Sequence, residues 1–193
     1  MMSFSDYWKQ IFQKNDELHR LFVDYWYDYS NIFTWQFWTA VILFIGPLII
    51  LIFTVDRKRL FEVFLFGYTI HMLWTYADFY LETHNLLIHP YFLSPTLPFG
   101  INMTASLLPV SFLLLYQYCT NRGKNFYVYG LLLCFLFGIV FATVSDMLDL
   151  LMFHKWMNQL YLFIIDVFII FPAYWFTLLI KYFQTKALKT KQD

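Results

Sequence analysis

Charged residues are scarce in this chain, at 13% of its 193 residues. An ordinary soluble domain carries about 25% charged residues, so roughly half the usual supply is present. The 13 basic residues balance the 13 acidic ones, which leaves no broad basic face to bind nucleic acid. Intrinsic disorder is excluded as well, because disordered chains are poor in aromatic residues, whereas 24% of this chain is aromatic.

Cysteine is also rare. Cys119 and Cys134 are the only two, and both lie in or beside apolar stretches. Two such cysteines form neither a disulfide framework nor a zinc motif. We therefore expect two buried or interfacial thiols, and the sequence leaves any cofactor and any metal unknown.

Hydrophobic residues, in contrast, make up 60% of the chain, and the mean hydropathy is +0.54. A water-soluble globule of this size could not bury that much apolar surface. A helix of about 20 apolar residues crosses the hydrocarbon core of a membrane, and continuous apolar runs indicate helices because barrel strands would alternate. The sequence predicts an all-α integral membrane bundle over 35–183, with transmembrane helices at about 35–55, 60–81, 100–119, 126–153 and 157–183.

Basic residues are concentrated in alternate connections between these five segments. They occupy residues 57–59, residues 122–124 and the tail over 184–193, whereas the loop between the second and third segments has none. By the positive-inside rule, the basic connections are cytoplasmic. Five spans then place the C-terminal tail in the cytoplasm and the N-terminus outside the plasma membrane.

The first 34 residues have apolar side chains at helical spacing and charged residues between them. This pattern predicts an amphipathic helix on the outer membrane surface. Ser3, with Asp6 three residues later, is expected to cap its start.

The loop over about 82–99 carries Pro90, Pro95 and Pro98, so it is not expected to be helical throughout. Several of its other residues are too apolar for a free loop. We therefore expect it to fold back onto the outer ends of the bundle.

Ionisable residues inside apolar segments are costly in a membrane and usually face the bundle interior or a wet cavity. At 100° per residue, His71, Asp78 and Glu82 share one face of the second segment, with Trp74 between them. His71 lies close to mid-membrane, and Asp166 of the fifth segment lies at a similar depth. We expect His71 and Asp166 to form a deep pair.

An outer group of acids is expected above this pair. It comprises Asp78, Glu82, Asp146 and Asp149, and it can be joined by His84, His89, His154 and Lys155. Neighbouring carboxylates repel one another, so some must be protonated, separated, solvated or bound to a cation. The predicted ligand-binding residues are His71, Trp74, Asp78, Glu82, Asp146, Asp149 and Asp166.

A structural role for these residues is the alternative. The outer acids can mark helix ends in the hydrated headgroup zone, and the deep pair can be an interhelical hydrogen bond.

Several short matches over residues 60–183 carry a resemblance. They are Asp78 followed by Tyr80, Leu108-Pro109 ahead of Tyr116-Gln117-Tyr118, and Lys155-Trp156. In these the chain resembles a family of small uncharacterised polytopic membrane proteins of spore-forming bacteria. The resemblance implies a bacterial plasma membrane as the location and implies no catalytic residue.

The leading functional hypothesis is a membrane protein that binds or transports a small cation, a proton or a cationic ligand through a polar pocket in the outer half of the bundle. Five spans are few for a transport path, so a homo-oligomer is expected, and the lipid bilayer is the other partner. One alternative is a noncatalytic assembly or sensory subunit, whose polar residues are structural.

Another alternative is an intramembrane metal-dependent hydrolase acting on lipid, with His71, Asp78, Asp146 and a loop histidine as metal ligands. No HExxH motif or nucleophile elbow is present. The sequence therefore favours a protein that is not an enzyme, without deciding the matter.

Overall fold

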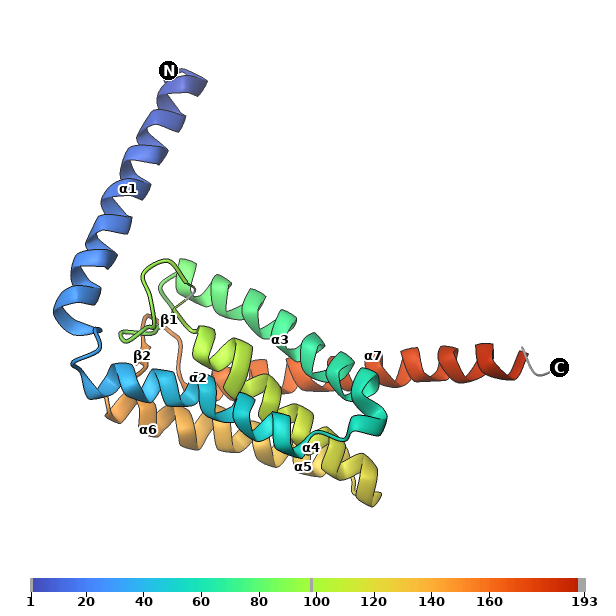
Figure 1. Cartoon of the computed structure of the whole chain (residues 1–193). Helices are drawn as coiled ribbons and strands as arrows, with labels where there is room; N and C mark the ends of the chain where they lie inside the picture. The colour runs from blue at the N-terminus through green and yellow to red at the C-terminus, as the bar shows by residue number, and fades with distance from the viewer. Residues whose placement is uncertain (1, 98, 191–193) are drawn as a thin grey trace.

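The computed structural model describes residues 2–97 and 99–190, and the chain is all-helical apart from one short pair of strands (Figure 1). The first elements are α1 (Phe4–Tyr29), α2 (Trp35–Thr54), the 3₁₀ turn η1 (Arg57–Arg59) and α3 (Leu60–Thr83). They are followed by β1 (Leu87–Ile88), the π-helical η2 (Met103–Leu107) and α4 (Leu108–Arg122). The last are α5 (Phe126–Phe135), the π-helical η3 (Leu136–Phe141), α6 (Ala142–Met147), β2 (Met152–Phe153) and α7 (Gln159–Thr190).

The long helices from α2 to α7 run alongside one another, and α1 projects away from one end of them at a steep angle (Figure 1). Within this bundle α3 packs on both α4 and α7. The core between them contains fully buried side chains, among them Phe66, Ile70, Phe112 and Ile170. The predicted all-α bundle is therefore confirmed.

The outside of the bundle is unusually apolar. Phe53 is 81% exposed, Phe61 94% and Phe168 74%, and a protein surrounded by water rarely exposes such patches. Three helices are long and apolar enough to cross a membrane: α2, the continuous helix Phe126–Met147 and α7 as far as Ala187. A membrane location is therefore supported.

The prediction of five transmembrane helices is supported for three segments only. Residues 60–81 and 100–119 are also largely helical. However, α3 and α4 are not among the helices that are long and apolar enough to cross a membrane. The physical reason is their polar content, which includes Glu62 and Asp78 in α3 and Gln117 and Arg122 in α4.

The predicted fourth segment was too long at its C-terminal end. Its helix ends at Met147 rather than at Phe153, because Asp149 adopts a left-handed conformation with φ +56°. The backbone N–H of Leu150 then donates to the carbonyl of Ser145 across 2.8 Å and reverses the chain. Residues 152–153 form β2 instead of helix.

The N-terminal segment is one continuous helix, α1. Ser3 caps it as expected, because its side chain accepts a hydrogen bond from the backbone N–H of Asp6 at 3.2 Å. None of its residues is buried, and its N-terminal part extends away from the bundle (Figure 1). Its C-terminal part is attached to the loop after α3, where the Trp26 indole donates to the Phe92 carbonyl across 3.1 Å.

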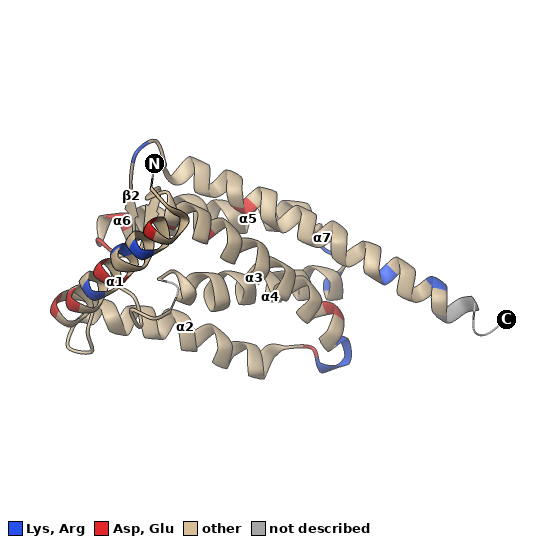
Figure 2. Ribbon diagram, turned by 90° about the horizontal axis from the view of Figure 1, so that it is seen from above, with Lys and Arg blue, Asp and Glu red and all other residues tan. Residues whose placement is uncertain are grey.

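The two ends of the bundle differ in charge (Figure 2). The end where α2 passes into α3 carries the basic residues of η1, and we call it the basic end. There Glu62 accepts hydrogen bonds from Arg59, Tyr116 and Lys181, so that α3, α4 and α7 are joined. The opposite end holds β1 and β2, and we call it the strand end.

Candidate functional site

The strand end is closed by two loops that pair with each other. Leu87 lies opposite Phe153, and Ile88 lies opposite Met152, in an antiparallel pair that joins the loop after α3 to the loop after α6. Most of the loop after α3 is packed inward, with Leu86, Leu87 and Phe92 buried, so the expected fold-back of this loop is confirmed. Pro98 lies outside the described residues.

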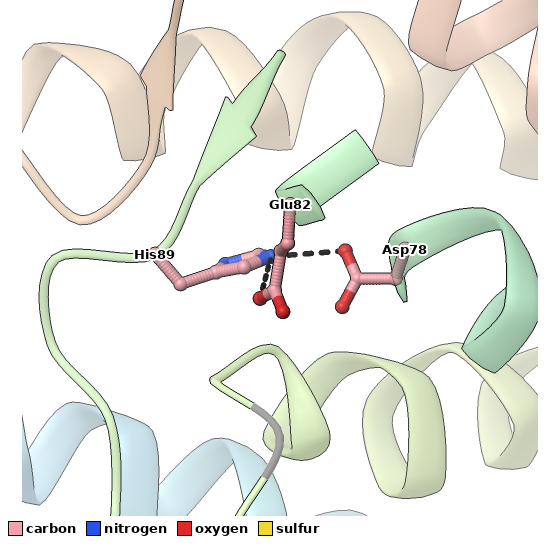
Figure 3. A group of neighbouring side chains, drawn as sticks. All are labelled: Asp78, Glu82 and His89. Atoms are coloured by element: carbon pink, nitrogen blue, oxygen red, sulfur yellow. Dashed lines mark hydrogen bonds and ion pairs between the residues drawn. The ribbon is translucent and has the colours of Figure 1, made fainter. Parts of the chain in front are cut away.

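This fold-back brings a histidine to the two carboxylates at the end of α3 (Figure 3). Asp78 and Glu82 are one helical turn apart and therefore share a face of α3. The His89 Nε2 atom lies 3.1 Å from Asp78 Oδ1 and 3.8 Å from Glu82 Oε1. One ligand atom from each of the three residues lies within 4.8 Å of the other two. We call Asp78, Glu82 and His89 the acid–histidine cluster.

Gly100 closes the acid–histidine cluster from the side of the third segment. Its backbone N–H donates to Glu82 Oε1 across 3.2 Å. A Cβ atom at this position would lie 2.2 Å from Asp78 Oδ2 and 2.8 Å from His89 Nε2. Only glycine lets the backbone approach the cluster so closely.

The cluster is buried, with Asp78 and His89 only 4% and 8% exposed. Burial opposes the charged imidazolium, but the neighbouring Asp78 and Glu82 carboxylates outweigh burial and hold the pKa of His89 above its ordinary value. Across 2–97 and 99–190, neither carboxylate forms an ion pair with a lysine or arginine. Two ionised carboxylates around one imidazolium leave a surplus negative charge, which favours a bound cation or a proton on one carboxyl.

A cavity of about 80 Å³ lies beside the cluster. Its polar lining includes Asp78 and His89 from the cluster, together with Trp74, Asn102 and Asp166. Most of the remaining lining is apolar and comes from α2, both π-helical segments and α6. Interruptions of regular helix of this kind are frequent at functional sites.

Asp166 and Trp74 share one interaction within this cavity. The Trp74 indole donates to Asp166 Oδ1 across 3.1 Å, and the Asp166 side chain is 2% exposed. His71 has a different partner, because its Nδ1 lies 2.8 Å from the Thr104 carbonyl oxygen. The expected deep pair of His71 and Asp166 is therefore not formed, since the two side chains bind different groups.

The other predicted residues lie outside the cavity and the cluster. Asp146 is half-buried near the end of α6, and Asp149 is exposed in the turn that follows. His84 is exposed, and its Nδ1 lies 2.9 Å from the Tyr80 carbonyl oxygen. His154 and Lys155 also bind backbone carbonyl groups of the loop after α3, and both are exposed.

The structure thus joins Asp78 and Glu82 directly and places Trp74 and Asp166 along the adjoining cavity. Of the histidines that were expected to join the outer acids, His89 is the one that lies beside Asp78 and Glu82. Gly100 was not predicted, although a glycine after a proline-rich loop is a signal for close approach of the backbone.

Comparison of the chain with protein-family models, with curated proteins and with solved structures finds no match. The resemblance to a membrane-protein family of spore-forming bacteria therefore stays a prediction. The function is argued from the geometry of the site, because a fold does not by itself define an activity.

Proposed function

We propose that this chain is a five-span membrane protein that binds a small cation in the outer half of its bundle, for storage, sensing or transport. The observation that carries the proposal is the acid–histidine cluster, in which Nε2 of a buried imidazole lies between two carboxylates that have no basic partner among the described residues. The surplus negative charge favours a positively charged ligand.

In this proposal α3 and α4 cross the membrane in addition to the three most apolar helices. At 1.5 Å per residue, the 24 residues of α3 extend about 36 Å, which exceeds the hydrocarbon thickness of about 30 Å. The acidic side chains of α3 face its neighbours, because Glu62 binds Tyr116 of α4 and Lys181 of α7 and Asp78 is buried. A helix whose acidic side chains face its neighbours can therefore cross a membrane with fewer apolar residues than one surrounded by lipid.

The charge distribution supports an orientation for these spans. The basic end carries η1 and the C-terminal part of α7 (Figure 2), and the positive-inside rule places it in the cytoplasm of a bacterial cell. The strand end and the N-terminus then lie outside the plasma membrane.

The direction of α1 supports a position in the outer interface. Its C-terminal end lies at the strand end, and the helix projects from there at a steep angle to the bundle helices (Figure 1). A helix inclined in this way can lie along the surface of a membrane that the bundle crosses. Its exposed aromatic residues, among them Phe4, Trp8 and Phe12, are of the kind that lie at the level of the lipid headgroups.

Thermal unfolding of the purified chain in detergent tests the cation-binding proposal. We expect the melting temperature to rise with at least one cation from a panel of Na⁺, K⁺, tetramethylammonium, Mg²⁺, Mn²⁺ and Zn²⁺. Asp78→Asn should abolish this rise. Asp149→Asn is the matched control, because Asp149 is exposed and asparagine tolerates its positive φ. If no cation in the panel raises the melting temperature, the proposal is wrong.

A second candidate function is the metal-dependent hydrolysis of lipid. The observation in its favour is the cavity, because a metal bound by three protein groups keeps an open position for water and substrate. Release of a water-soluble headgroup from phospholipid vesicles that depends on both a metal ion and Asp78 would support it. If no headgroup is released, the function is cation binding or the noncatalytic assembly or sensory role.

The expected homo-oligomer also belongs to the proposal. The cavity is formed within one copy of the chain, so binding does not require a second copy. Five spans are few for a transport path, so transport is expected to involve a homo-oligomer. Mass measurement in lipid nanodiscs distinguishes one copy from several.

A further inference from the structure

We infer that the acid–histidine cluster is a binding site for a divalent transition-metal ion of the zinc type. The ligand atoms are one carboxylate oxygen each from Asp78 and Glu82 and the Nε2 atom of His89. This inference rests on the proposed cation-binding function and names the chemical class of the cation.

The spacing of the ligand atoms fits one small ion. Zinc binds imidazole nitrogen and carboxylate oxygen at about 2.0–2.2 Å, so two ligands of a tetrahedral zinc ion lie about 3.4 Å apart. The two distances from His89 Nε2, 3.1 Å to Asp78 and 3.8 Å to Glu82, lie on either side of this value. All three ligand atoms lie within 4.8 Å of one another, so small side-chain rotations can bring them onto one ion.

The kinds of ligand atom select among cations. Na⁺, Mg²⁺ and Ca²⁺ prefer sites made wholly of oxygen, whereas a mixture of imidazole nitrogen and carboxylate oxygen suits zinc and its neighbours. An organic ammonium ion is too large for the space between atoms 3.1 Å apart. Gly100 restricts this space further, because even one Cβ atom there would collide with two of the ligand residues.

The surroundings also fit a metal with an open coordination position. Two of the three ligand residues, Asp78 and His89, line the cavity, so that a fourth ligand can reach the ion from there. Asn102 lines the same cavity and offers an amide there. The cavity is large enough for water.

Metal binding is measured on the full chain without a histidine tag, purified in detergent and treated with a chelator. We expect one Zn²⁺ per chain by elemental analysis, and a rise in melting temperature that saturates at this stoichiometry. Co²⁺ should give the visible absorption of a four-coordinate site. His89→Gln should weaken Zn²⁺ binding at least 100-fold, whereas His84→Gln, which changes an exposed histidine near the end of α3, should leave it unchanged.

Glu82→Gln provides a second test if His89→Gln fails to fold, because the Glu82 side chain is more exposed, at 19% against 8%. It should weaken Zn²⁺ binding at least tenfold. Equal Zn²⁺ affinity in the wild type and in a folded cluster variant would overturn the metal site.

The outcomes also separate this inference from the proposed function. Stabilisation by Na⁺, K⁺, Mg²⁺ or tetramethylammonium that depends on Asp78, without a response to Zn²⁺, Mn²⁺ or Co²⁺, would overturn the metal site and leave cation binding intact. Failure of every cation in the panel would overturn both.

Discussion

The Trp74 indole donates a hydrogen bond to Asp166 across 3.1 Å and thereby joins α3 to α7 inside the bundle. Both side chains are almost fully buried, and both line the cavity next to the acid–histidine cluster. A buried carboxyl group is costly unless a donor satisfies it, and Trp74 is that donor. The two residues therefore serve the stability of the bundle as well as the shape of its cavity.

Trp74→Phe is expected to lower the free energy of unfolding by about 1–2 kcal/mol, because it leaves Asp166 without its indole donor. The measurement is unfolding by a denaturing detergent in mixed micelles. Trp175→Phe is the control, since the Trp175 indole donates to the Tyr127 hydroxyl at an exposed position. Equal losses in the two variants would contradict the special role of the buried hydrogen bond.

Gly138→Ala is expected to destabilise the bundle by about 1–3 kcal/mol, because α7 lies too close for an added methyl group. A Cβ atom at Gly138 would lie 2.5 Å from the Cα atom of Phe163. Gly46→Ala is the matched control within α2, where an added Cβ meets nothing within 4 Å. That variant should be neutral or more stable, because alanine favours a helix over glycine. The same unfolding assay ranks the two, and the reverse order would refute the packing argument.

Ser30→Ala is expected to loosen the loop that carries His89. The Ser30 hydroxyl accepts from the Phe92 backbone N–H at 2.9 Å and donates to its carbonyl at 3.1 Å. Loss of a buried hydrogen bond of about 1.4 kcal/mol should speed hydrogen exchange at Phe92 about tenfold. Mass spectrometry of peptides covering 86–93 measures this rate. Ser94→Ala, at an exposed hydroxyl pair with Thr96, should leave it unchanged.

Labelling of introduced cysteines is expected to place the N-terminus outside the cell and the C-terminus inside. Ser5 and Thr185 are exposed near the two ends of the chain, and the native thiols of Cys119 and Cys134 are buried and give little background. A maleimide that does not cross membranes should label Ser5→Cys in intact cells and Thr185→Cys only after permeabilisation. Labelling of both in intact cells would contradict an odd number of spans.

The helices could be predicted from the sequence because their signal is local. Continuous apolar runs of about 20 residues indicate helices whatever their neighbours are. The position of Asp78 and Glu82 on one face of α3 follows from helical periodicity alone. The left-handed end of the helix at Asp149 was missed, because residues other than glycine rarely adopt a positive φ and nothing in the sequence marks this one.

The composition of the site depends on contacts between distant segments. The depth of a residue in the membrane follows from its position along the helix, and this placed His71 and Asp166 at a similar depth. Which group each side chain contacts depends on how the helices pack, and the sequence of one helix does not give this. His89 reaches Asp78 only because its loop folds back and pairs with residues 152–153.

The attachment of α1 to the Phe92 carbonyl has a mechanical consequence. Phe92 is three residues from His89, and the chain between them contains Pro90, which stiffens it. A displacement of the C-terminal part of α1 would therefore move backbone that lies only three residues from the imidazole. The position of α1 and the geometry of the acid–histidine cluster are thus coupled through the loop after α3.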